Sequence, residues 1–410
     1  MSQPKQAVIL CGGLGTRLSP YTDSMPKPMI SCNGKPFLWY LIQQLHEQKI
    51  NRFVLLTGYL SEKINEYFGD GSEWGWQIEY SEGPVEWDTG RRLWESKEKL
   101  DNTFLMLYSD NFVPFPLQKV LAFHKQNHKP LTFMVAAKSP GNISLNKEGI
   151  VNNYDYNRSD ADLNYVEIGY MIIEKDKIFS FYEHPDCSFS TILYKMAAQH
   201  QISGWIQNDQ YHSISDPERW KETEEYLKDK KIILIDRDGV INKKAPQGEY
   251  ITKWEEFRWI PETRTAMKLL AKEGFRFIVI SNQAGVARGM VDQNELNCIH
   301  KKMKDELLNE SIQIIDIYVC PHHWNEGCSC RKPKPGMMLQ ASREHLLRLD
   351  KTLFIGDDIR DCQTAENAGC ESIFVGKATV LATLPTKEHP ICHSPLLTDC
   401  LPIITEYFHQ

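Results

Sequence analysis

The amino-acid sequence predicts an α/β protein with two successive domains, each a Rossmann-like sandwich of three layers with a sheet between helices. Short apolar runs recur along the chain with amphipathic segments between them, and loops rich in glycine or carboxylate follow several runs. Runs of this length that alternate with helical segments are typical of buried strands in parallel sheets. The 410 residues are enough for two or three domains.

The expected strands fall into two groups with a charged segment between them. Residues 217–231 begin with a proline and carry mixed charge, which predicts a solvated helix. A new apolar run starts directly afterwards, so we place the domain boundary near Asp229, between domains at 1–228 and 229–410. The expected strands cover residues 7–10, 53–56, 104–107 and 131–135 in the first domain, and 232–235, 277–280 and 353–355 in the second.

The composition is that of an ordinary globular protein, with 41% apolar and 25% charged residues. A net charge of −7 gives no reason to expect a nucleic-acid or membrane partner, and no apolar stretch approaches the ~18 residues of a membrane helix. The start of the chain does not resemble a signal peptide, and the 11 cysteines are mostly scattered, which indicates a reducing compartment. We therefore expect a cytoplasmic protein. The sequence does not determine the oligomeric state, and a homo-oligomer is one of the possibilities that it leaves open.

A glycine-rich loop follows the first expected strand and reads LCGGLGTRLSPYTDSMPKPM from Leu10. Glycines let the backbone curl so that its N–H groups face an anion, and an arginine adds a forked, permanently charged phosphate ligand. A GG-x-G turn alone is as often a plain turn, and this spacing is neither a dinucleotide fingerprint nor a P-loop. The full string favours phosphate binding, with the candidate residues Gly12, Gly13, Gly15, Thr16, Arg17 and Lys27.

This string resembles the sugar nucleotidyltransferase family, whose signature is GG-x-G-TRL-x-P-x-T followed by PKP. The resemblance covers roughly the first 220 residues and implies a nucleotidyltransferase fold. It implies that the loop and Arg17 hold the phosphates of an NTP, while Lys27 supports attack of a sugar 1-phosphate on the α-phosphorus. It also implies that Glu82, Thr89 and Gly90, in SEGPVEWDTGRRL, lie around the base and the sugar.

The same resemblance implies that Asp110 binds Mg²⁺. Asp110 follows an apolar run, and ligand sites gather at the carboxyl edge of such sheets; a helix N-cap is the alternative. Two positions depart from the family pattern. Arg91 stands where a second glycine is usual, and aligning ISDPERW puts Ser213 in place of a second metal-binding aspartate, with Asp216 close by but out of register. A hydroxyl is a poorer Mg²⁺ ligand than a carboxylate, so a non-catalytic nucleotide- or sugar-binding module stays open as an alternative.

Carboxylates, a hydroxyl and cations follow the expected strands of the second half. Asp236 and Asp238 come after a strand at spacing two, which aims both side chains to one side of an extended chain. Two close carboxylates repel unless a cation or a proton lies between them, which indicates Mg²⁺ and a general acid. Further candidates are Ser281, Arg331, Lys332, Asp357 and Asp361, in strand ends or nearby loops.

This set resembles the haloacid dehalogenase phosphatases over nearly all of residues 230–375. The resemblance implies that Asp236 is a nucleophile that forms an aspartyl-phosphate and that Asp238 is the general acid and then the general base. It implies that Ser281 and Lys332 bind the phosphoryl oxygens, and that Asp236, the Asp238 carbonyl and Asp357 hold Mg²⁺. About 45 residues separate Asp236 from Ser281, which leaves no room for a large cap domain and predicts a capless fold.

The segment CPHHWNEGCSCRKPKPG contains a tight cluster of cysteine and histidine. Cys320, His322, Cys328 and Cys330 match a closed tetrahedral Zn²⁺ site, which is structural because it has no open position. His323 is an alternative ligand, and a set of free thiols is the alternative to a metal site.

DRDGVIN, this loop and RKPKPG together resemble the D-glycero-D-manno-heptose 1,7-bisphosphate 7-phosphatases, while histidinol-phosphate phosphatases share the loop. Asp358 stands where the heptose phosphatases often carry lysine, and Arg331 is expected to bind the distal part of the substrate. The two resemblances imply successive reactions on sugar phosphates. The phosphatase leaves a heptose 1-phosphate, and the nucleotidyltransferase couples it to an NTP for bacterial surface polysaccharide. GTP is favoured as the NTP, although TGRRL is also similar to cytidylyltransferases.

Overall fold

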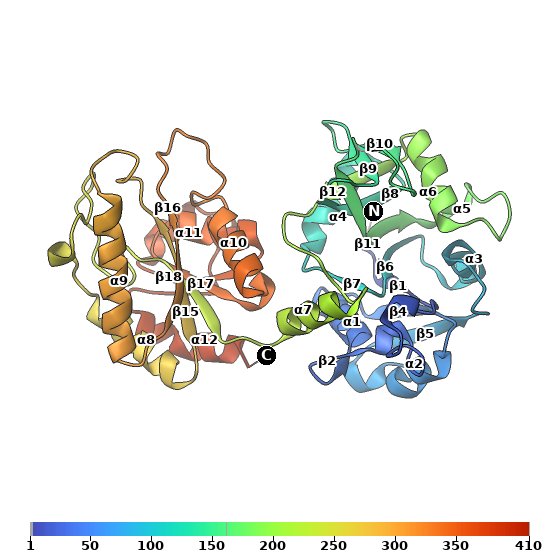
Figure 1. The fold of residues 1–410 in the computed structure, drawn as a ribbon, viewed down its shortest axis with the longest axis horizontal. Coiled ribbons are helices and arrows are strands. Elements are labelled where there is room, and N and C mark those ends of the chain that lie inside the picture. The colour runs from blue at the N-terminus through green and yellow to red at the C-terminus, as the bar shows by residue number, and fades with distance from the viewer. Residues whose placement is uncertain (1–2, 161, 410) are drawn as a thin grey trace. The chain divides into compact units, whose positions relative to one another are not determined.

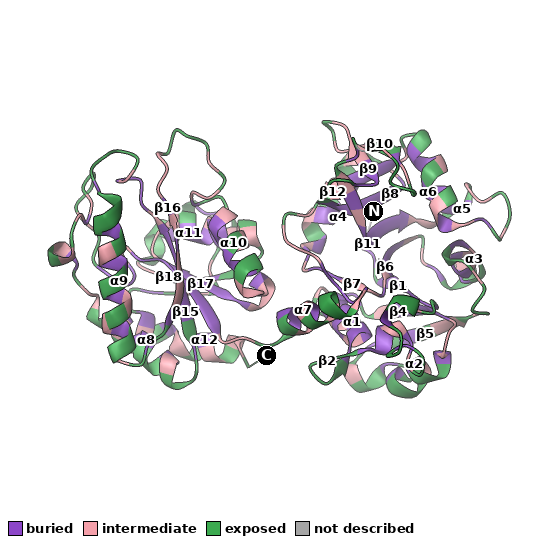
Figure 2. Ribbon diagram, viewed as in Figure 1, coloured by how far each residue is buried: buried purple, intermediate pink, exposed green. Residues whose placement is uncertain are grey.

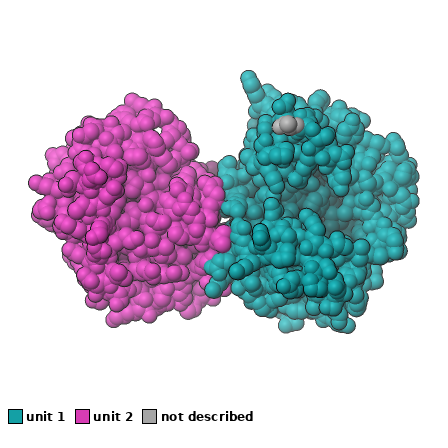
Figure 3. Space-filling model, in the orientation of Figure 1, with its two compact units in different colours: residues 1–228 teal, residues 229–410 magenta. Residues whose placement is uncertain are grey.

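The computed structural model describes residues 3–160 and 162–409. The chain divides into two compact units, residues 1–228 and residues 229–410 (Figure 3). Each unit has a sheet with helices against it (Figure 1), which confirms the predicted α/β class. Within the described ranges, no helix combines the length and the apolar character needed to cross a membrane.

The first unit is built on a nine-stranded sheet in which β1 (Gln6–Cys11) is central. The path of the sheet is β10-β9-β11-β6-β1-β4-β5, and β8 joins β11 to β12. Two small two-stranded sheets pair β2 with β3 and β7 with β13. The strands after β1 are β2 Ser31–Cys32, β3 Lys35–Pro36, β4 Arg52–Thr57, β5 Gln77–Glu82, β6 Thr103–Tyr108, β7 Asn111–Phe112, β8 Leu131–Ala137, β9 Ile143–Leu145, β10 Val151–Tyr154, β11 Tyr165–Glu174, β12 Ile202–Ile206 and β13 His212–Ser213.

Helices cover both faces of this sheet because its central strands are apolar on both faces. Val8 and Leu10 of β1 pack in one core cluster, and Ile9 between them is also fully buried. Figure 2 shows the consequence, with buried strands inside and helices that expose their outer faces. The helices are α1 Phe37–Glu47, α2 Ser61–Phe68, α3 Thr89–Glu95, α4 Leu117–Asn127, α5 Lys175–Phe179, α6 Phe189–Ala198 and α7 Pro217–Leu227.

The sheet of the first unit is mixed, whereas the sequence predicted parallel strands. β11, buried along most of its length, runs antiparallel to both β6 and β8. Periodicity shows that a strand is buried but not in which direction it runs, so this departure was invisible in the sequence. The predicted charged helix is α7, which begins at Pro217 and is capped by the side chain of Asp216.

The second unit contains a six-stranded sheet in which all neighbouring strands are parallel, in the order β16-β15-β14-β17-β18-β19. Alternate residues of β14 pack into two different cores. Ile233 and Ile235 lie in the cluster with α8 and α9, while Ile232 and Leu234 lie in the cluster with α10. This gives the three layers that the sequence predicts. The strands are β14 Ile232–Ile235, β15 Arg276–Asn282, β16 Ile314–Cys320, β17 Leu353–Gly356, β18 Glu371–Val375 and β19 Cys392–Ser394, and the helices are α8 Pro261–Lys272, α9 Gln293–Asn309, α10 Gly336–His345, α11 Ile359–Ala368 and α12 Leu401–Tyr407.

Candidate active sites

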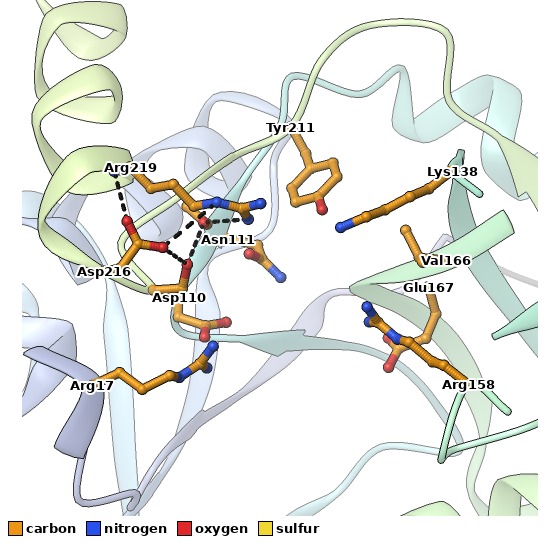
Figure 4. Close-up of a pocket in the computed structure, with 12 residues that line it drawn as sticks. Arg17, Asp110, Asn111, Lys138, Arg158, Val166, Glu167, Tyr211, Asp216 and Arg219 are labelled. Atoms are coloured by element: carbon orange, nitrogen blue, oxygen red, sulfur yellow. Dashed lines mark hydrogen bonds and ion pairs between the residues drawn. The ribbon is translucent and has the colours of Figure 1, made fainter. Parts of the chain in front are cut away.

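The first site lies at the carboxyl edge of the first sheet, where the strand order reverses. From β1 the chain continues to β4 and β5 on one side, and β6 then pairs with the other side of β1. Ligands of open α/β sheets bind at such a switch point. A pocket of about 330 Å³ lies there, and its walls carry the cations Arg17, Lys138, Arg158 and Arg219 (Figure 4). This charge suits a ligand with several phosphates.

Two of the predicted residues meet at the base of this site. The Lys27 Nζ lies 2.7 Å from the Asp110 Oδ2, and both side chains are largely buried. Asp110 follows β6 and precedes the short strand β7, so the alternative that it caps a helix does not hold. Arg17 lines the same pocket as Asp110. The structure thus brings together Arg17, the candidate for phosphate binding, Lys27, the candidate for supporting the attack, and Asp110, the candidate for metal binding.

The glycine loop packs against two cationic side chains. Gly15 has a φ of +66°, and a Cβ there would lie 2.9 Å from the Cβ of Lys27. A Cβ on Gly12 would collide with the guanidinium of Arg92. Arg92 is 4% exposed and donates to the carbonyls of Gly12 (3.3 Å) and Thr57 (2.6 Å). Gly12 and Gly15 are therefore needed so that the Arg92 and Lys27 side chains can lie close to the loop backbone. The sequence had explained these glycines by phosphate binding alone.

The other first-unit candidates lie around the site without lining the described part of the pocket. Gly13 and Thr16 are exposed in the loop. Glu82 ends β5 and accepts a hydrogen bond from the Ser61 hydroxyl at 2.7 Å. Thr89 begins α3 at its exposed end. Gly90 is buried, and a Cβ on it would collide with backbone at residues 187–189, so its small size serves packing.

Ser213 lines the pocket that contains Asp110, and its surroundings are cationic. It is 4% exposed and pairs with Asn111 between β13 and β7. The Arg219 Nη1 donates to the Ser213 Oγ at 3.4 Å. Asp216, which alignment placed out of register, lines the same pocket while its carboxylate accepts from the Arg219 backbone N–H at 3.0 Å. A second carboxylate is therefore present in the pocket from a position that the sequence did not favour.

The opposite wall of the pocket carries groups that the sequence analysis missed. Figure 4 shows Lys138, Arg158 and Glu167 across the cavity from Arg17 and Asp110. Burial raises the pKa of Glu167 to about 7. Neither a motif nor a periodicity marks these residues, because Lys138 follows β8 directly, Glu167 lies in β11 and Arg158 lies in the loop between β10 and β11.

The second site lies where the order of the second sheet reverses, between β14 and its neighbours β15 and β17. Asp236 follows β14 directly and is 7% exposed. The Lys332 Nζ lies 2.9 Å from the Asp236 Oδ1 and 2.7 Å from the Asp361 Oδ1. Burial raises the pKa of Asp236 to about 7; Lys332 opposes this rise, and the carboxylates of Asp361 and Asp238 add to it. Ser281 lines the same cavity of about 100 Å³.

Asp238 is surrounded by hydrogen-bond donors. Its carboxylate accepts from the Arg237 guanidinium at 2.8 and 3.0 Å, from the Asn242 amide at 2.9 Å and from the Gln283 amide at 2.6 Å. Burial alone would raise the pKa of Asp238, but Arg237, Asn242 and Gln283 outweigh it and hold the pKa below its usual value. Gln283 also donates to the Ser281 hydroxyl at 2.8 Å, so one amide connects the acid–base candidate to a phosphate-binding candidate.

Three carboxylates of this site can share a divalent cation. Oxygens of Asp236, Asp357 and Asp361 all lie within 4.8 Å of one another. The Asp357 Oδ1 is buried without a hydrogen-bond partner among the described residues, while its Oδ2 pairs with the Lys244 Nζ at 2.7 Å. An all-carboxylate donor set suits Mg²⁺. Asp361 is thus the third carboxylate of this metal-binding group, and the side chain of Asp238 is not part of it.

The cysteine–histidine loop folds its four candidates into one cluster. Cys320 and Cys328 have their Sγ atoms 3.7 Å apart, and the His322 Nδ1 lies 3.7 Å from the Cys320 Sγ and 3.2 Å from the Cys330 Sγ. Ligands of a tetrahedral Zn²⁺ ion lie about 3.5–3.8 Å from one another, given the usual metal–ligand distances. The two distances of 3.7 Å lie in this range and the third is shorter, and ligand atoms of all four residues lie within 4.8 Å of one another, so the cluster can hold that ion.

The loop continues directly into two further candidates. The guanidinium of Arg331 donates to the carbonyl of His322 at 3.5 Å. The Lys332 backbone N–H donates to Asn282 at 3.1 Å, and Asn282 donates back to the Lys332 carbonyl at 3.3 Å. The cysteine cluster and Asn282 together fix the backbone from which Lys332 reaches Asp236. The sequence prediction did not include Asn282, although its position next to Ser281 at the end of a strand could have indicated it.

Comparison with protein families matches the two units separately. Residues 6–152 match the family described as nucleotidyl transferase, and residues 329–394 match the family described as HAD-hydrolase-like.

Individual proteins are similar to one unit each. The D-glycero-alpha-D-manno-heptose-1,7-bisphosphate 7-phosphatase of Mycobacterium bovis is 33% identical over 157 residues, which cover 36% of this chain and 80% of that protein. The crystal structure of D,D-heptose 1,7-bisphosphate phosphatase from Bordetella bronchiseptica, complexed with magnesium and phosphate, is 31% identical, covers 43% of this chain and 98% of its own, and has a TM-score of 0.40. The structure of HddC from Yersinia pseudotuberculosis is 21% identical, covers 54% of this chain and 99% of its own, and has a TM-score of 0.47.

Proposed function

Because the chain belongs to the D-glycero-D-manno-heptose-1,7-bisphosphate 7-phosphatase family, we propose that it is a bifunctional enzyme that makes a nucleotide-activated heptose. The second domain, residues 229–410, removes the C7 phosphate of the bisphosphate. The first domain, residues 1–228, couples the resulting heptose 1-phosphate to an NTP and releases pyrophosphate. The observation that supports this most is the buried Asp236–Lys332–Asp361 arrangement beside Asp238, at the switch point of a parallel sheet.

In the phosphatase reaction, a carboxylate oxygen of Asp236 attacks the phosphorus of the C7 phosphate, and the bond to the C7 oxygen breaks. Asp238, in its protonated form, gives a proton to that leaving oxygen, since an alkoxide is a poor leaving group. Asp238 then takes a proton from a water molecule, which attacks the aspartyl-phosphate and releases inorganic phosphate. Lys332 and Ser281 bind the phosphoryl oxygens, and Arg331 binds the distal part of the substrate.

Asp236, Asp357, Asp361 and the Asp238 carbonyl would hold Mg²⁺, which would supply positive charge to the phosphoryl group. The cysteine–histidine cluster would hold a structural Zn²⁺, which would fix the loop that carries Arg331 and Lys332. The fit of both sites rests on the buried, unpartnered Asp357 oxygen and on the tetrahedral spacing of the cluster.

In the transferase reaction, an oxygen of heptose 1-phosphate attacks the α-phosphorus of the NTP, and the bond to pyrophosphate breaks. We propose that the glycine loop and Arg17 hold the triphosphate and that Lys27 neutralises the charge that develops at the α-phosphate. Asp110 is the carboxylate that would hold Mg²⁺. We favour GTP, and we propose that Glu82, Thr89 and Gly90 lie around its base and the sugar.

A second candidate function is favoured by Ser213. With the Arg219 guanidinium 3.4 Å from its hydroxyl, this position offers a metal ion only a neutral hydroxyl that a cation already contacts, which is a poorer ligand than a carboxylate. The first unit could therefore bind nucleotide or sugar without catalysing transfer. The intact Lys27–Asp110 pair opposes this alternative. Binding of each NTP without formation of a nucleotide sugar from heptose 1-phosphate would establish it.

The phosphatase assignment is tested by phosphate release from heptose 1,7-bisphosphate. Asp236→Asn should lower the rate by several orders of magnitude, because the nucleophile is lost. Asp110→Ala is the matched control, since it removes a carboxylate from the other unit and should leave phosphate release unchanged. Full activity in Asp236→Asn would overturn the assignment.

A further inference from the structure

A buried arginine separates the two aspartates that open the second unit. Arg237 is 1% exposed, and burying a cation costs several kcal/mol unless it is paired and hydrogen-bonded. Its Nη2 donates to both carboxylate oxygens of Asp238, at 3.0 and 2.8 Å. Because one nitrogen contacts both oxygens, the contact centres the carboxylate on the guanidinium and pairs its charge. Arg237 therefore limits where the Asp238 carboxylate can lie.

The other end of this guanidinium is held by a histidine from a distant helix. The Arg237 Nη1 lies 3.0 Å from the Nε2 of His300, which is on α9 and 8% exposed. Arginine has no acceptor, so the Nε2 must be the unprotonated nitrogen that accepts. Burial, with Arg237 adding to it, lowers the pKa of His300 to about 3. The imidazole is thus neutral, and it is an acceptor in a fixed position.

From this chain of contacts we infer that His300 is a positioning residue for the phosphatase reaction, because it holds Arg237 in the orientation in which Arg237 aligns Asp238. The inference rests on the proposed function of the second unit. His300 touches neither the cavity-lining groups nor the metal-binding candidates in the contacts described, so its effect reaches the reaction through Arg237.

The alignment matters because Asp238 transfers a proton in both half-reactions. A general acid or base must lie within hydrogen-bond reach of the atom it serves, and a small misplacement of a catalytic group is costly. Asn242 and Gln283 also donate to Asp238, so its misplacement after loss of His300 should be partial. General acid–base catalysis contributes roughly 10²–10⁴-fold, and we expect loss of His300 to remove about 10–100-fold of it.

Three variants of the full chain separate positioning from plain stability. His300→Leu keeps the bulk but removes the acceptor, whereas His300→Gln places an amide oxygen where it can accept from Arg237. Met303→Ala, on the same helix and fully buried, is the control that destabilises α9 while it leaves both side chains of the His300–Arg237 hydrogen bond in place. With heptose 1,7-bisphosphate, His300→Leu should lower kcat about 10–100-fold with KM nearly unchanged, His300→Gln should recover most of that loss, and Met303→Ala should lower the Tm while keeping kcat.

A second substrate distinguishes failure of this inference from failure of the proposed function. With 4-nitrophenyl phosphate, whose leaving group needs no proton, His300→Leu should show a burst of one equivalent of nitrophenolate before slow turnover, because hydrolysis of the aspartyl-phosphate still needs Asp238. Equal kcat in His300→Leu and wild type, or equal loss in His300→Gln and His300→Leu, would overturn the inference alone. A wild type that releases phosphate from neither substrate would overturn the proposed function and the inference with it.

Discussion

Replacement of Lys332 by methionine should strongly destabilise the second unit. The Lys332 side chain is 4% exposed, and it pairs with two carboxylates, Asp236 and Asp361, whose side chains are 10% and 2% exposed. Methionine keeps the buried aliphatic stem but leaves two acidic groups close together without their cation. Removing one partner of a buried ion pair costs about 3–5 kcal/mol. In a unit of 182 residues (410 − 228), about 2–4 °C per kcal/mol gives a fall in Tm of roughly 6–20 °C.

The assay is thermal unfolding followed by circular dichroism, in buffer without added divalent cations, so that no Mg²⁺ replaces the lost charge and no chelator removes zinc from the cysteine–histidine cluster. Adding Asp361→Asn to Lys332→Met should recover part of the loss, with a coupling energy of about 1–3 kcal/mol. Lys301→Met is the control, because this lysine is 80% exposed and exposed pairs contribute little. A Tm of Lys332→Met within the error of wild type, or strictly additive effects in the double variant, would contradict the reasoning.

Three further outcomes follow from the two sites. Elemental analysis should find about one zinc per chain, and Cys328→Ser should lower both the zinc content and the Tm; a zinc-free wild type that melts like the variant would refute the cluster. Lys244→Met should lower the Mg²⁺ concentration needed for half-maximal thermal protection about 2–5-fold, because this half-exposed lysine competes for Asp357 with the modest strength of a partly solvated pair; an unchanged or higher requirement would show that Lys244 does not compete. Asp110→Ala should abolish formation of the nucleotide sugar while phosphate release continues, and retained transfer would remove Asp110 from the metal site.

Much of the fold follows from apolar runs, because a strand buried on both faces needs a continuous apolar segment. All seven predicted runs are strands, from β1 to β17. β16 was missed because more than half of its residues are only partly buried and Asp316 interrupts its apolar run. The direction of β11 was not accessible for a different reason, since direction depends on long-range pairing and not on local pattern.

In the candidate sites too, residues marked by a local sequence pattern could be predicted, whereas residues defined by long-range contacts could not. Residues directly after strands, such as Asp110 and Asp236, could be selected because the carboxyl ends of parallel strands share one edge. Residues that act by packing against or holding other side chains could not be selected from the sequence. Arg92 and His300 sit on helices, in patterns that are typical of ordinary amphipathic segments, and the partner of His300 lies 63 residues away in the sequence. Lys244 was hidden for a similar reason, since its loop carries no motif.

The central claim is that one chain performs both reactions, and a single product assay tests it most directly. The full-length protein is incubated with heptose 1,7-bisphosphate, Mg²⁺ and each of the four NTPs in turn, and products are followed by mass spectrometry. We expect release of one phosphate per sugar, followed by a nucleoside-diphosphate heptose and pyrophosphate, with GTP the preferred NTP. Accumulation of heptose 1-phosphate with every NTP, and no nucleotide sugar with any of them, would contradict the claim.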